Sequence, residues 1–370
     1  MTPVVAVLHE LKRRERDAEV RFWCDRSFGN AARSLLDRSG LDIRMDTVVS
    51  GKFRRYYHLS KIQHFTTRAV FWPNVRDGVL IVCGIMQSVA KLIIWRPDVV
   101  FTKGGYVCLP IGLAAHWLRI PLVIHDSDAH PGLTNRILAR WATTIATGAP
   151  LEHYPYPTSR TVYVGIPIAE EFRPYTPDQV AAARAVLGVD AVRPLVVVTG
   201  GGLGAVRLNN AVMAIAPELL ATMTIVLISG VHQYAELQPR AARLGDHFVL
   251  KAFVDSGMAD VMGAADVVVA RAGATTILEL AALQKPTILV PNAHLTGGHQ
   301  LKNAAVYESA GAVLSVRDDA IANDPAALAS AIRQLVEHPA AARDMAATFA
   351  TFAKPSAARD MAQLIIDAAT

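Results

Sequence analysis

Cysteine is scarce in this chain, which limits the classes of protein it can belong to. Cys24, Cys83 and Cys108 are the three cysteines among 370 residues. Their number is odd, and their spacing does not match that of metal ligands. A disulfide framework is therefore not expected, and a reduced cytoplasmic protein is the natural expectation.

Long uninterrupted apolar runs are lacking as well. The most apolar stretch, Val79 to Trp95, is 17 residues long and contains Lys91. A membrane-spanning helix needs about 20 apolar residues, so no transmembrane segment is expected. Hydrophobic residues nevertheless make up 52% of the chain.

Charged residues are few, 19% of the chain, but their balance is positive, with a net charge of +5. This charge suits an anionic membrane surface or a phosphorylated substrate as readily as nucleic acid. With no RNA-binding motif and no lysine-rich tail, we expect no nucleic-acid partner. Cations interleaved with aromatic residues form a candidate interfacial patch, although packing beneath a long loop is an alternative for the aromatics. These cations are Arg54, Arg55, Lys61, Arg68 and Arg76.

Short apolar strands alternate with helical segments along the whole chain, which predicts an α/β fold with parallel sheets. A chain of 370 residues is too long for one compact core. The alternation restarts after a proline-rich stretch near residue 165. We predict two Rossmann-like domains, residues 1–164 and 165–354, facing a cleft, and a last helix, 355–370, that could cross back onto the first domain. Strands are predicted at 19–23, 42–49, 98–101, 121–125, 161–164, 195–199, 224–229, 248–250, 266–269 and 287–290.

The first domain is expected to lack its first strand. Pro3 suits the first turn of a helix that runs to about Arg13. A doubly wound sheet begins instead with a strand that lies in its middle. We therefore expect that a strand and the loop after it belong before this helix.

A turn at the end of the strand 266–269 is the most informative motif. Ala270 to Gly273 consists of small residues around Arg271, and a helix with a single early carboxylate, Glu279, follows. The backbone N–H groups of Ala274, Thr275 and Thr276 at the start of that helix suit a phosphate, and Glu279 can accept from ribose hydroxyls. The segment therefore predicts a nucleotide site, with a glycine-rich connection and a surface glutamate as the alternative.

A second glycine-rich loop, residues 200–205, leaves the strand 195–199 and opens a helix. Gly201, Gly202 and Gly204 allow close approach of the backbone, so the loop can hold a diphosphate. A dinucleotide site is the rival, but no acidic residue ends the next strand to bind a ribose.

The first domain has its own strand-loop-helix motif, Lys103, Gly104, Gly105 and Tyr106, which can cradle a phosphate. The side chain of Lys103 adds a positive charge to this phosphate site, or alternatively it is an ordinary solvated side chain at the surface.

The neighbouring strand ends with His125, Asp126 and Asp128, which can supply a base and acceptors for sugar hydroxyls, or form a turn.

Polar groups also crowd the loop 291–303 of the second domain. Such neutral groups suit a sugar, and His294 with His299 lacks a third ligand, so no metal is expected. Phe253 and Val254, which leave another strand, offer a flat apolar edge to a base, with ordinary core packing as the alternative.

Taken together, these segments resemble the MurG family of GT-B glycosyltransferases, and the resemblance covers nearly all of the chain. Its motifs are 103–107, 125–135, 200–205, 271–279 and 299–303. The resemblance implies an inverting transfer of N-acetylglucosamine from UDP-GlcNAc to undecaprenyl-diphosphate-MurNAc-pentapeptide, lipid I, to give lipid II. It implies a peripheral protein on the cytoplasmic face of the membrane and neither cofactor nor metal.

The resemblance also implies site residues in each domain. In the donor site, Phe253 and Val254 would contact the uracil, the turn at 274–276 the diphosphate, Glu279 the ribose, and His299 and Gln300 the sugar. In the acceptor site, the diphosphate would bind at 103–106 together with Asn135, and the catalytic candidates are His125, Asp126 and Asp128.

Several positions depart from the family pattern. Asp126, Ser127 and Asp128 replace Glu-Gln-Asn, residues 202–203 replace Ser-Gln, and Ala169 replaces an arginine. The glycine loop that follows the family's first strand precedes the point at which this chain begins. A related transferase with another lipid-linked or glycolipid acceptor, or a nucleotide-sugar-binding protein without turnover, therefore remains an alternative.

Overall fold

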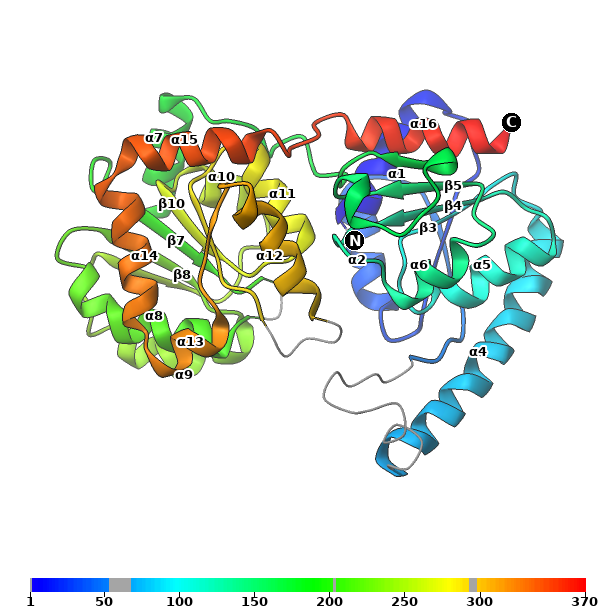
Figure 1. Ribbon diagram of the computed structural model, residues 1–370, viewed down its shortest axis with the longest axis horizontal. Coiled ribbons are helices and arrows are strands. Elements are labelled where there is room, and N and C mark those ends of the chain that lie inside the picture. Colours follow the sequence, from blue (N-terminus) through cyan, green and yellow to red (C-terminus); the bar gives the residue numbers. More distant parts are fainter. Residues whose placement is uncertain (1, 53–67, 202–203, 293–297) are drawn as a thin grey trace. The chain divides into compact units, whose positions relative to one another are not determined.

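The computed structural model describes residues 2–52, 68–201, 204–292 and 298–370. The chain forms two compact units (Figure 1). Unit 1 comprises Met1–Ala169 together with Lys354–Thr370, and unit 2 comprises Glu170–Ala353. Each unit is an α/β structure in which every strand pairing is parallel, so the predicted fold class is confirmed.

Unit 2 has one six-stranded sheet in the order β12-β11-β10-β7-β8-β9. The chain fills one half of the sheet from β7 outward and then crosses to β10 to fill the other half. This is the order of a doubly wound sheet, in which ligands bind where the strand order reverses. The strands are β7 (Leu195–Thr199), β8 (Thr224–Ile228), β9 (Phe248–Lys251), β10 (Val267–Ala270), β11 (Thr287–Leu289) and β12 (Leu314–Ser315).

Helices cover the sheet of unit 2 because its central strands are apolar on both faces. On one face, Val196 and Val198 of β7 pack with Leu208 of α8 and Leu328 of α14 in a single buried cluster. The helices of this unit are α7 (Pro177–Leu187), α8 (Val206–Leu219), α9 (Val231–Ala241), α10 (Met258–Gly263), α11 (Ala274–Ala282), α12 (His299–Ser309), α13 (Asp318–Asn323), α14 (Ala326–Glu337) and α15 (Pro339–Ala350).

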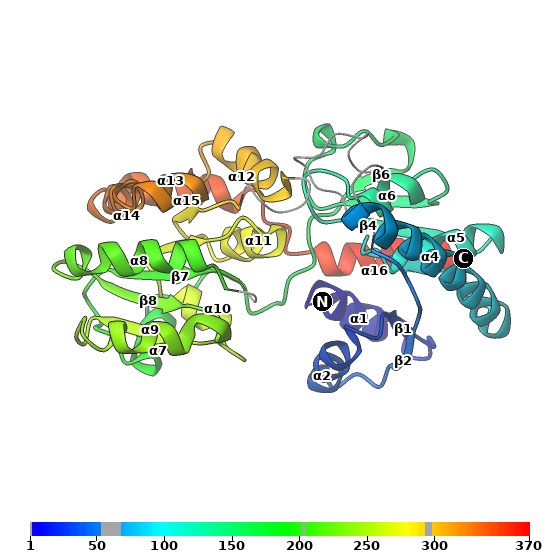
Figure 2. The same cartoon turned by 90° about the horizontal axis from the view of Figure 1, so that it is seen from below.

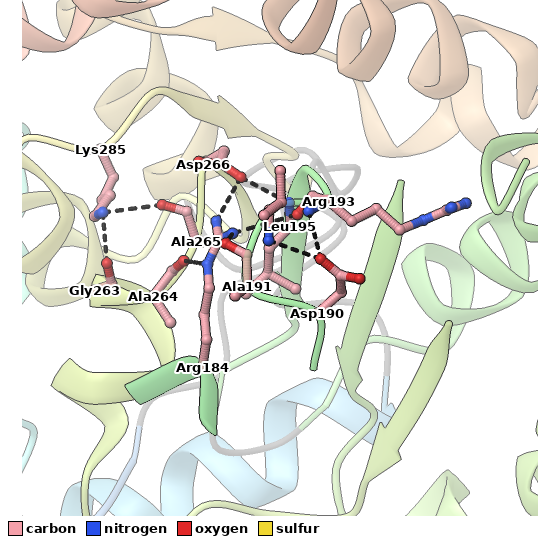
Figure 3. Close-up of polar contacts among 11 residues, drawn as sticks. Arg184, Asp190, Ala191, Arg193, Leu195, Gly263, Ala264, Ala265, Asp266 and Lys285 are labelled. Carbon is pink, nitrogen blue, oxygen red and sulfur yellow. Dashed lines mark hydrogen bonds and ion pairs between the residues drawn. The ribbon is translucent and has the colours of Figure 1, made fainter. Parts of the chain in front are cut away.

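A polar cluster closes the amino ends of β7 and β10 (Figure 3). Arg184 of α7 is 5% exposed and donates to the carbonyls of Ala264 and Ala191 and, over 2.7 Å, to the carboxylate of Asp266. Asp266 also accepts the backbone N–H of Leu195. Because this cluster satisfies buried polar groups at the edge opposite the strands' carboxyl ends, it holds the fold together away from the candidate site.

Unit 1 contains two separate sheets (Figure 2). One pairs β1 (Arg21–Cys24) with β2 (Arg44–Thr47), and the other has the order β3-β4-β5-β6. Among the described residues β1 and β3 belong to different sheets and do not pair, and the expectation that a further strand and its loop belong before α1 stays a prediction. The second sheet consists of β3 (Val100–Thr102), β4 (Leu122–Asp126), β5 (Thr144–Thr147) and β6 (Thr161–Tyr163).

Both ends of the chain contribute to one core in unit 1. Val7 of α1 packs with Met361 and Ile365 of α16 and with Val123 of β4. The last helix therefore covers the sheet that the first half of the chain builds. The helices of this unit are α1 (Thr2–Arg14), α2 (Gly29–Ser39), α4 (Arg68–Trp95), α5 (Cys108–Trp117), α6 (Leu133–Leu138) and α16 (Ala357–Ala369), with short 3-10 turns at Leu151–His153 and Thr158–Arg160.

Helix α4 is longer than the sequence suggests. Its segment Phe71–Trp95 is 25 residues long and contains an 18-residue window with a mean hydropathy of 1.9, so by length and composition it could cross a membrane. The expectation that the chain has no transmembrane segment stays a prediction, because a helix that packs in a protein core can have the same length and composition. One face of α4 is part of the core, since Ile81, Ile85 and Leu92 are buried against the elements around α5.

The opposite face of α4 is apolar and exposed. Its side chains recur every three or four positions from residue 72 to residue 86 and again at residue 93, which is the spacing of one helical face. We call this face the α4 stripe, and its residues are Trp72, Val75, Val79, Val82, Met86 and Ile93, which are 41% to 62% exposed.

Candidate functional site

Two turns follow the strands at which the order of the unit 2 sheet reverses. Helix α11 begins directly after β10, and its N-cap residue, Gly273, has no side chain to accept the first N–H groups. The backbone N–H groups of Ala274, Thr275 and Thr276 form this open end of the helix. A helix terminus of this kind binds anionic groups through its N–H donors and the helix dipole.

The glycine loop after the adjacent strand β7 is built by close backbone contacts. Gly204 has φ +75°, and a Cβ there would lie 2.6 Å from the carbonyl oxygen of Ser229. Gly201 has φ +76° and its N–H donates to Thr199. Both positions therefore require glycine, while Gly202 lies outside the described residues.

Glu279 is one turn further along α11. Burial, with a smaller contribution from Glu171, raises the pKa of Glu279 to about 7. A carboxylate held in such an environment gains from a ligand whose hydroxyl groups donate hydrogen bonds to it.

The remaining donor-site candidates follow other strands of unit 2. Phe253 follows β9 and is 48% exposed, beside a partly buried Val254. His299 and Gln300 open helix α12, and Gln300 accepts the backbone N–H of Asn292 over 2.9 Å. The structure thus places these candidates on the same unit as the two turns, each just after a strand or at the start of a helix.

Sequence reasoning missed the ion-pair network that fixes the α11 turn. Arg271 donates to the carbonyl of Val290 and lies 2.5 Å from Asp318, which is 1% exposed. Arg207 of α8 donates to the other oxygen of Asp318 over 3.0 Å. Asp318 thereby joins the two turns of the switch point. No motif marks this aspartate in the sequence.

In unit 1, the loop after β3 packs against a buried side-chain amide, that of Asn135. Gly104 has φ +88°, and a Cβ there would lie 2.5 Å from the Nδ2 of Asn135. Asn135 is 1% exposed and donates to the carbonyl of His125. Asn135 thus supports the loop, while Gly105 is exposed and Tyr106 lies 6.0 Å from the ammonium of Lys52.

His125 is enclosed at the end of β4. It is 0% exposed, and its two ring nitrogens lie 2.8 Å from the carbonyl oxygen of Gly165 and 3.2 Å from the hydroxyl of Ser127. Burial and the nearby charge of Lys103 lower the pKa of His125 to about 3. A neutral, enclosed imidazole of this kind holds its neighbours in place, and the geometry does not support its use as a base.

The two carboxylates after β4 differ in exposure. Asp126 is 5% exposed and accepts a 2.7 Å hydrogen bond from the hydroxyl of Tyr156. Burial raises the pKa of Asp126 to about 6, against the opposing hydrogen bonds from Tyr156 and Asn135. Asp128 is less buried, and the hydroxyl of Tyr154 donates to its backbone carbonyl. Asp128 is therefore the better placed of the two to meet a substrate.

Both halves of the chain match family models of the same enzymes. Residues 1–147 match the glycosyltransferase family 28 N-terminal domain, and residues 195–361 match the glycosyltransferase family 28 C-terminal domain.

Curated relatives match most of the chain. An enzyme of Halalkalibacterium halodurans named UDP-N-acetylglucosamine--N-acetylmuramyl-(pentapeptide) pyrophosphoryl-undecaprenol N-acetylglucosamine transferase is 30% identical over 326 residues, which cover 87% of this chain and 84% of the relative. Its namesake in Geobacillus thermodenitrificans is 32% identical over 79% of this chain and 76% of the relative. Among solved structures, MurG of Acinetobacter baumannii has a TM-score of 0.73 at 23% identity, with 99% of this chain and 95% of that chain covered.

Two Rossmann-like units, the second with two open turns where its strand order reverses, define the GT-B class of glycosyltransferases. With relatives at 30% identity or more over most of their length, the chain belongs to the MurG family within glycosyltransferase family 28.

Proposed function

We propose that this protein transfers N-acetylglucosamine from UDP-GlcNAc to undecaprenyl-diphosphate-MurNAc-pentapeptide and so forms lipid II. The relatives at 30% and 32% identity bear the name of this activity. The observation that carries the proposal is the pair of turns, Gly200–Ala205 and Arg271–Thr276, at the carboxyl ends of the adjacent strands β7 and β10.

In this proposal unit 2 binds the donor. The N–H groups at 274–276 and the glycine loop bind the diphosphate, and Glu279 accepts from the ribose. Phe253 and Val254 contact the uracil, and His299 and Gln300 contact the sugar. Binding by main-chain donors at a helix N-terminus stabilises the charge that develops on the departing UDP.

Unit 1 binds the acceptor at the loop of Lys103 to Tyr106. A hydroxyl oxygen of the acceptor sugar attacks the anomeric carbon while its proton passes to Asp128. The bond from that carbon to UDP breaks, and the electron pair leaves with UDP, which inverts the anomeric configuration. Asp126 and His125 are positioning residues here, since both are buried and hydrogen-bonded.

We further infer a peripheral position on the cytoplasmic face of an anionic membrane. The α4 stripe supports it, because an exposed apolar face on a helix whose other face packs in the core can bury in the headgroup region. Trp117, 63% exposed at the end of α5, is another exposed apolar side chain of this unit. Of the basic and aromatic segment, residues 53–67 lie outside the described residues.

Radiolabel transfer tests the proposed function directly. The full chain, incubated with labelled UDP-GlcNAc and lipid I, is expected to move the label into a lipid-extractable product. Reactions without lipid I, or with undecaprenyl-diphosphate-linked sugars of other kinds, give the background and the acceptor range. Tight binding of UDP without any transfer to lipid I would refute the proposal.

A further inference from the structure

Lys103 and Ser127 form a contact that the reaction outlined above does not use. They follow β3 and β4, which pair in parallel, so both lie at the carboxyl edge of the unit 1 sheet. The ammonium of Lys103 donates to the hydroxyl oxygen of Ser127 over 2.6 Å, and that hydroxyl lies 3.2 Å from the Nδ1 of His125.

The direction of these hydrogen bonds follows from their chemistry. The carbonyl of Gly165 can only accept, so the Nε2 of His125 carries the proton and donates to it. The Nδ1 of the neutral ring then has a lone pair, and the hydroxyl of Ser127 must donate to it. The oxygen of Ser127 consequently presents its lone pairs to Lys103, whose ammonium can only donate.

The ammonium is thus held at a fixed point with donors to spare. Within the described residues one of its three N–H groups donates to Ser127, which leaves the others for an anion. Burial lowers the pKa of Lys103 to about 8, while the charges of Asp128 and Asp126 oppose this shift. Among the described residues, the neutral ring of His125 is the other titratable side chain that interacts with it.

We propose that Ser127 is a positioning residue that holds the Lys103 ammonium for contact with the diphosphate of the acceptor. The hydroxyl is anchored on His125, and His125 is anchored on the backbone of Gly165. These contacts therefore fix the position of the Lys103 ammonium relative to the sheet. The inference rests on the proposed function, because the acceptor there carries a diphosphate.

Binding of undecaprenyl diphosphate in detergent micelles, measured between pH 6.5 and 9.5, tests the proposal without requiring turnover. The affinity of the wild-type chain should fall as Lys103 loses its proton around pH 8. Ser127→Ala should weaken binding by about threefold to tenfold at pH 7, since a hydrogen bond to the charged group is lost. It should also move the fall to lower pH, because that bond favours the charged lysine.

Further variants separate positioning from folding. Ser127→Thr keeps the hydroxyl and should restore both the affinity and the pH profile. The Lys103→Met chain should bind undecaprenyl diphosphate weakly, and its affinity should not fall around pH 8. Lys91→Met is the matched control, because Lys91 pairs with Asp46 away from the loop, and its binding should equal that of the wild type.

These experiments distinguish a failure of the proposed role of Ser127 from a failure of the proposed transferase function. Affinity for UDP should stay unchanged in every variant, which confirms that unit 2 is intact. A Ser127→Ala chain with wild-type affinity and an unchanged pH profile would overturn the role of Ser127. Absence of label transfer by a wild-type chain that still binds undecaprenyl diphosphate in this pH-dependent way would count against the transferase reaction alone.

Discussion

Glu279 combines a partly buried carboxylate with a position one turn from the open N-terminal end of α11. Burial raises its pKa to about 7, so its charge changes within the range of pH at which the enzyme can be assayed. A protonated carboxyl group loses much of its capacity to accept from two ribose hydroxyls. In the proposed donor site, nucleotide affinity is therefore linked to the protonation of this one residue.

Affinity for UDP is expected to fall as the pH decreases through 7, in addition to any change from the phosphates. Glu279→Gln should remove this extra dependence, and Glu279→Ala should weaken binding by about tenfold to a hundredfold at pH 8. Calorimetric titration measures both. Glu337→Ala, which removes an exposed glutamate at the end of α14, is the control, and equal affinities for Glu279→Ala and this control would exclude the ribose contact.

The same carboxylate should lower the stability of the ligand-free protein. Its pKa is raised from 4.5 in the unfolded chain to about 7 in the fold, so the native state binds more protons between these values. Stability is therefore lost as the pH rises from 4.5 to 7. Glu279→Gln should stabilise unit 2 by about 1 to 3 kcal/mol at pH 8 and by much less at pH 4.5 in denaturant unfolding. A gain of the same size at both pH values would contradict this assignment.

At the scale of secondary structure, the α4 stripe makes a prediction that is independent of the nucleotide. Val82→Asp combined with Met86→Asp places two charges on this exposed face without entering the core. Binding to vesicles that contain phosphatidylglycerol should fall by at least about tenfold, because apolar burial in the interface is lost. Cosedimentation measures it, with UDP affinity expected to stay unchanged.

Two exposed valines of the other unit provide the matched control. Val186 and Val192 are 87% and 89% exposed, so Val186→Asp with Val192→Asp adds the same charge to unit 2. Vesicle binding of this control should match the wild type. Equal losses in both double variants would show that net charge, and not the α4 stripe, governs membrane association.

The sequence predicts those strands and helices that are marked by a pattern within their own residues. The apolar run of residues 195–199 predicts β7 with the observed bounds, since a buried parallel strand needs an unbroken apolar segment. Strand β5, Thr144–Thr147, gives no such signal because its sequence TIAT has no continuous apolar run, and β12 has only two residues. Helix α4 was underestimated because Pro73 and Gly78 interrupt the helical pattern in its first half.

Some features of the candidate site can likewise be predicted from local sequence, and others cannot. Glycines at positive φ, such as Gly104 and Gly204, mark the turns in the sequence because other residues are strained there. The contact between Lys103 and Ser127 depends on the register of β3 against β4, and the link from Arg271 to Asp318 joins segments far apart in the chain. Neither pair of residues is marked by a local sequence pattern, so these two contacts can be identified only from the folded structure.

At the scale of the whole molecule, the chain leaves unit 1, builds unit 2 and returns. Met361 of α16 is 0% exposed and completes the core of unit 1, although it follows unit 2 in the sequence. Each unit has its own buried clusters, so each should unfold as a cooperative block. Thermal unfolding of the full chain is accordingly expected to show two transitions.

The two transitions should respond separately to a ligand and to core substitutions. UDP at a hundredfold excess over its dissociation constant should stabilise only the unit 2 transition, by roughly 2.7 kcal/mol. Met361→Ala should lower the other transition by about 2 to 4 kcal/mol, whereas Leu208→Ala, in the core of α8, should lower the one that UDP raises. Differential scanning calorimetry measures both transitions. A single transition that moves with UDP and with either substitution would show that α16 and the two cores unfold together.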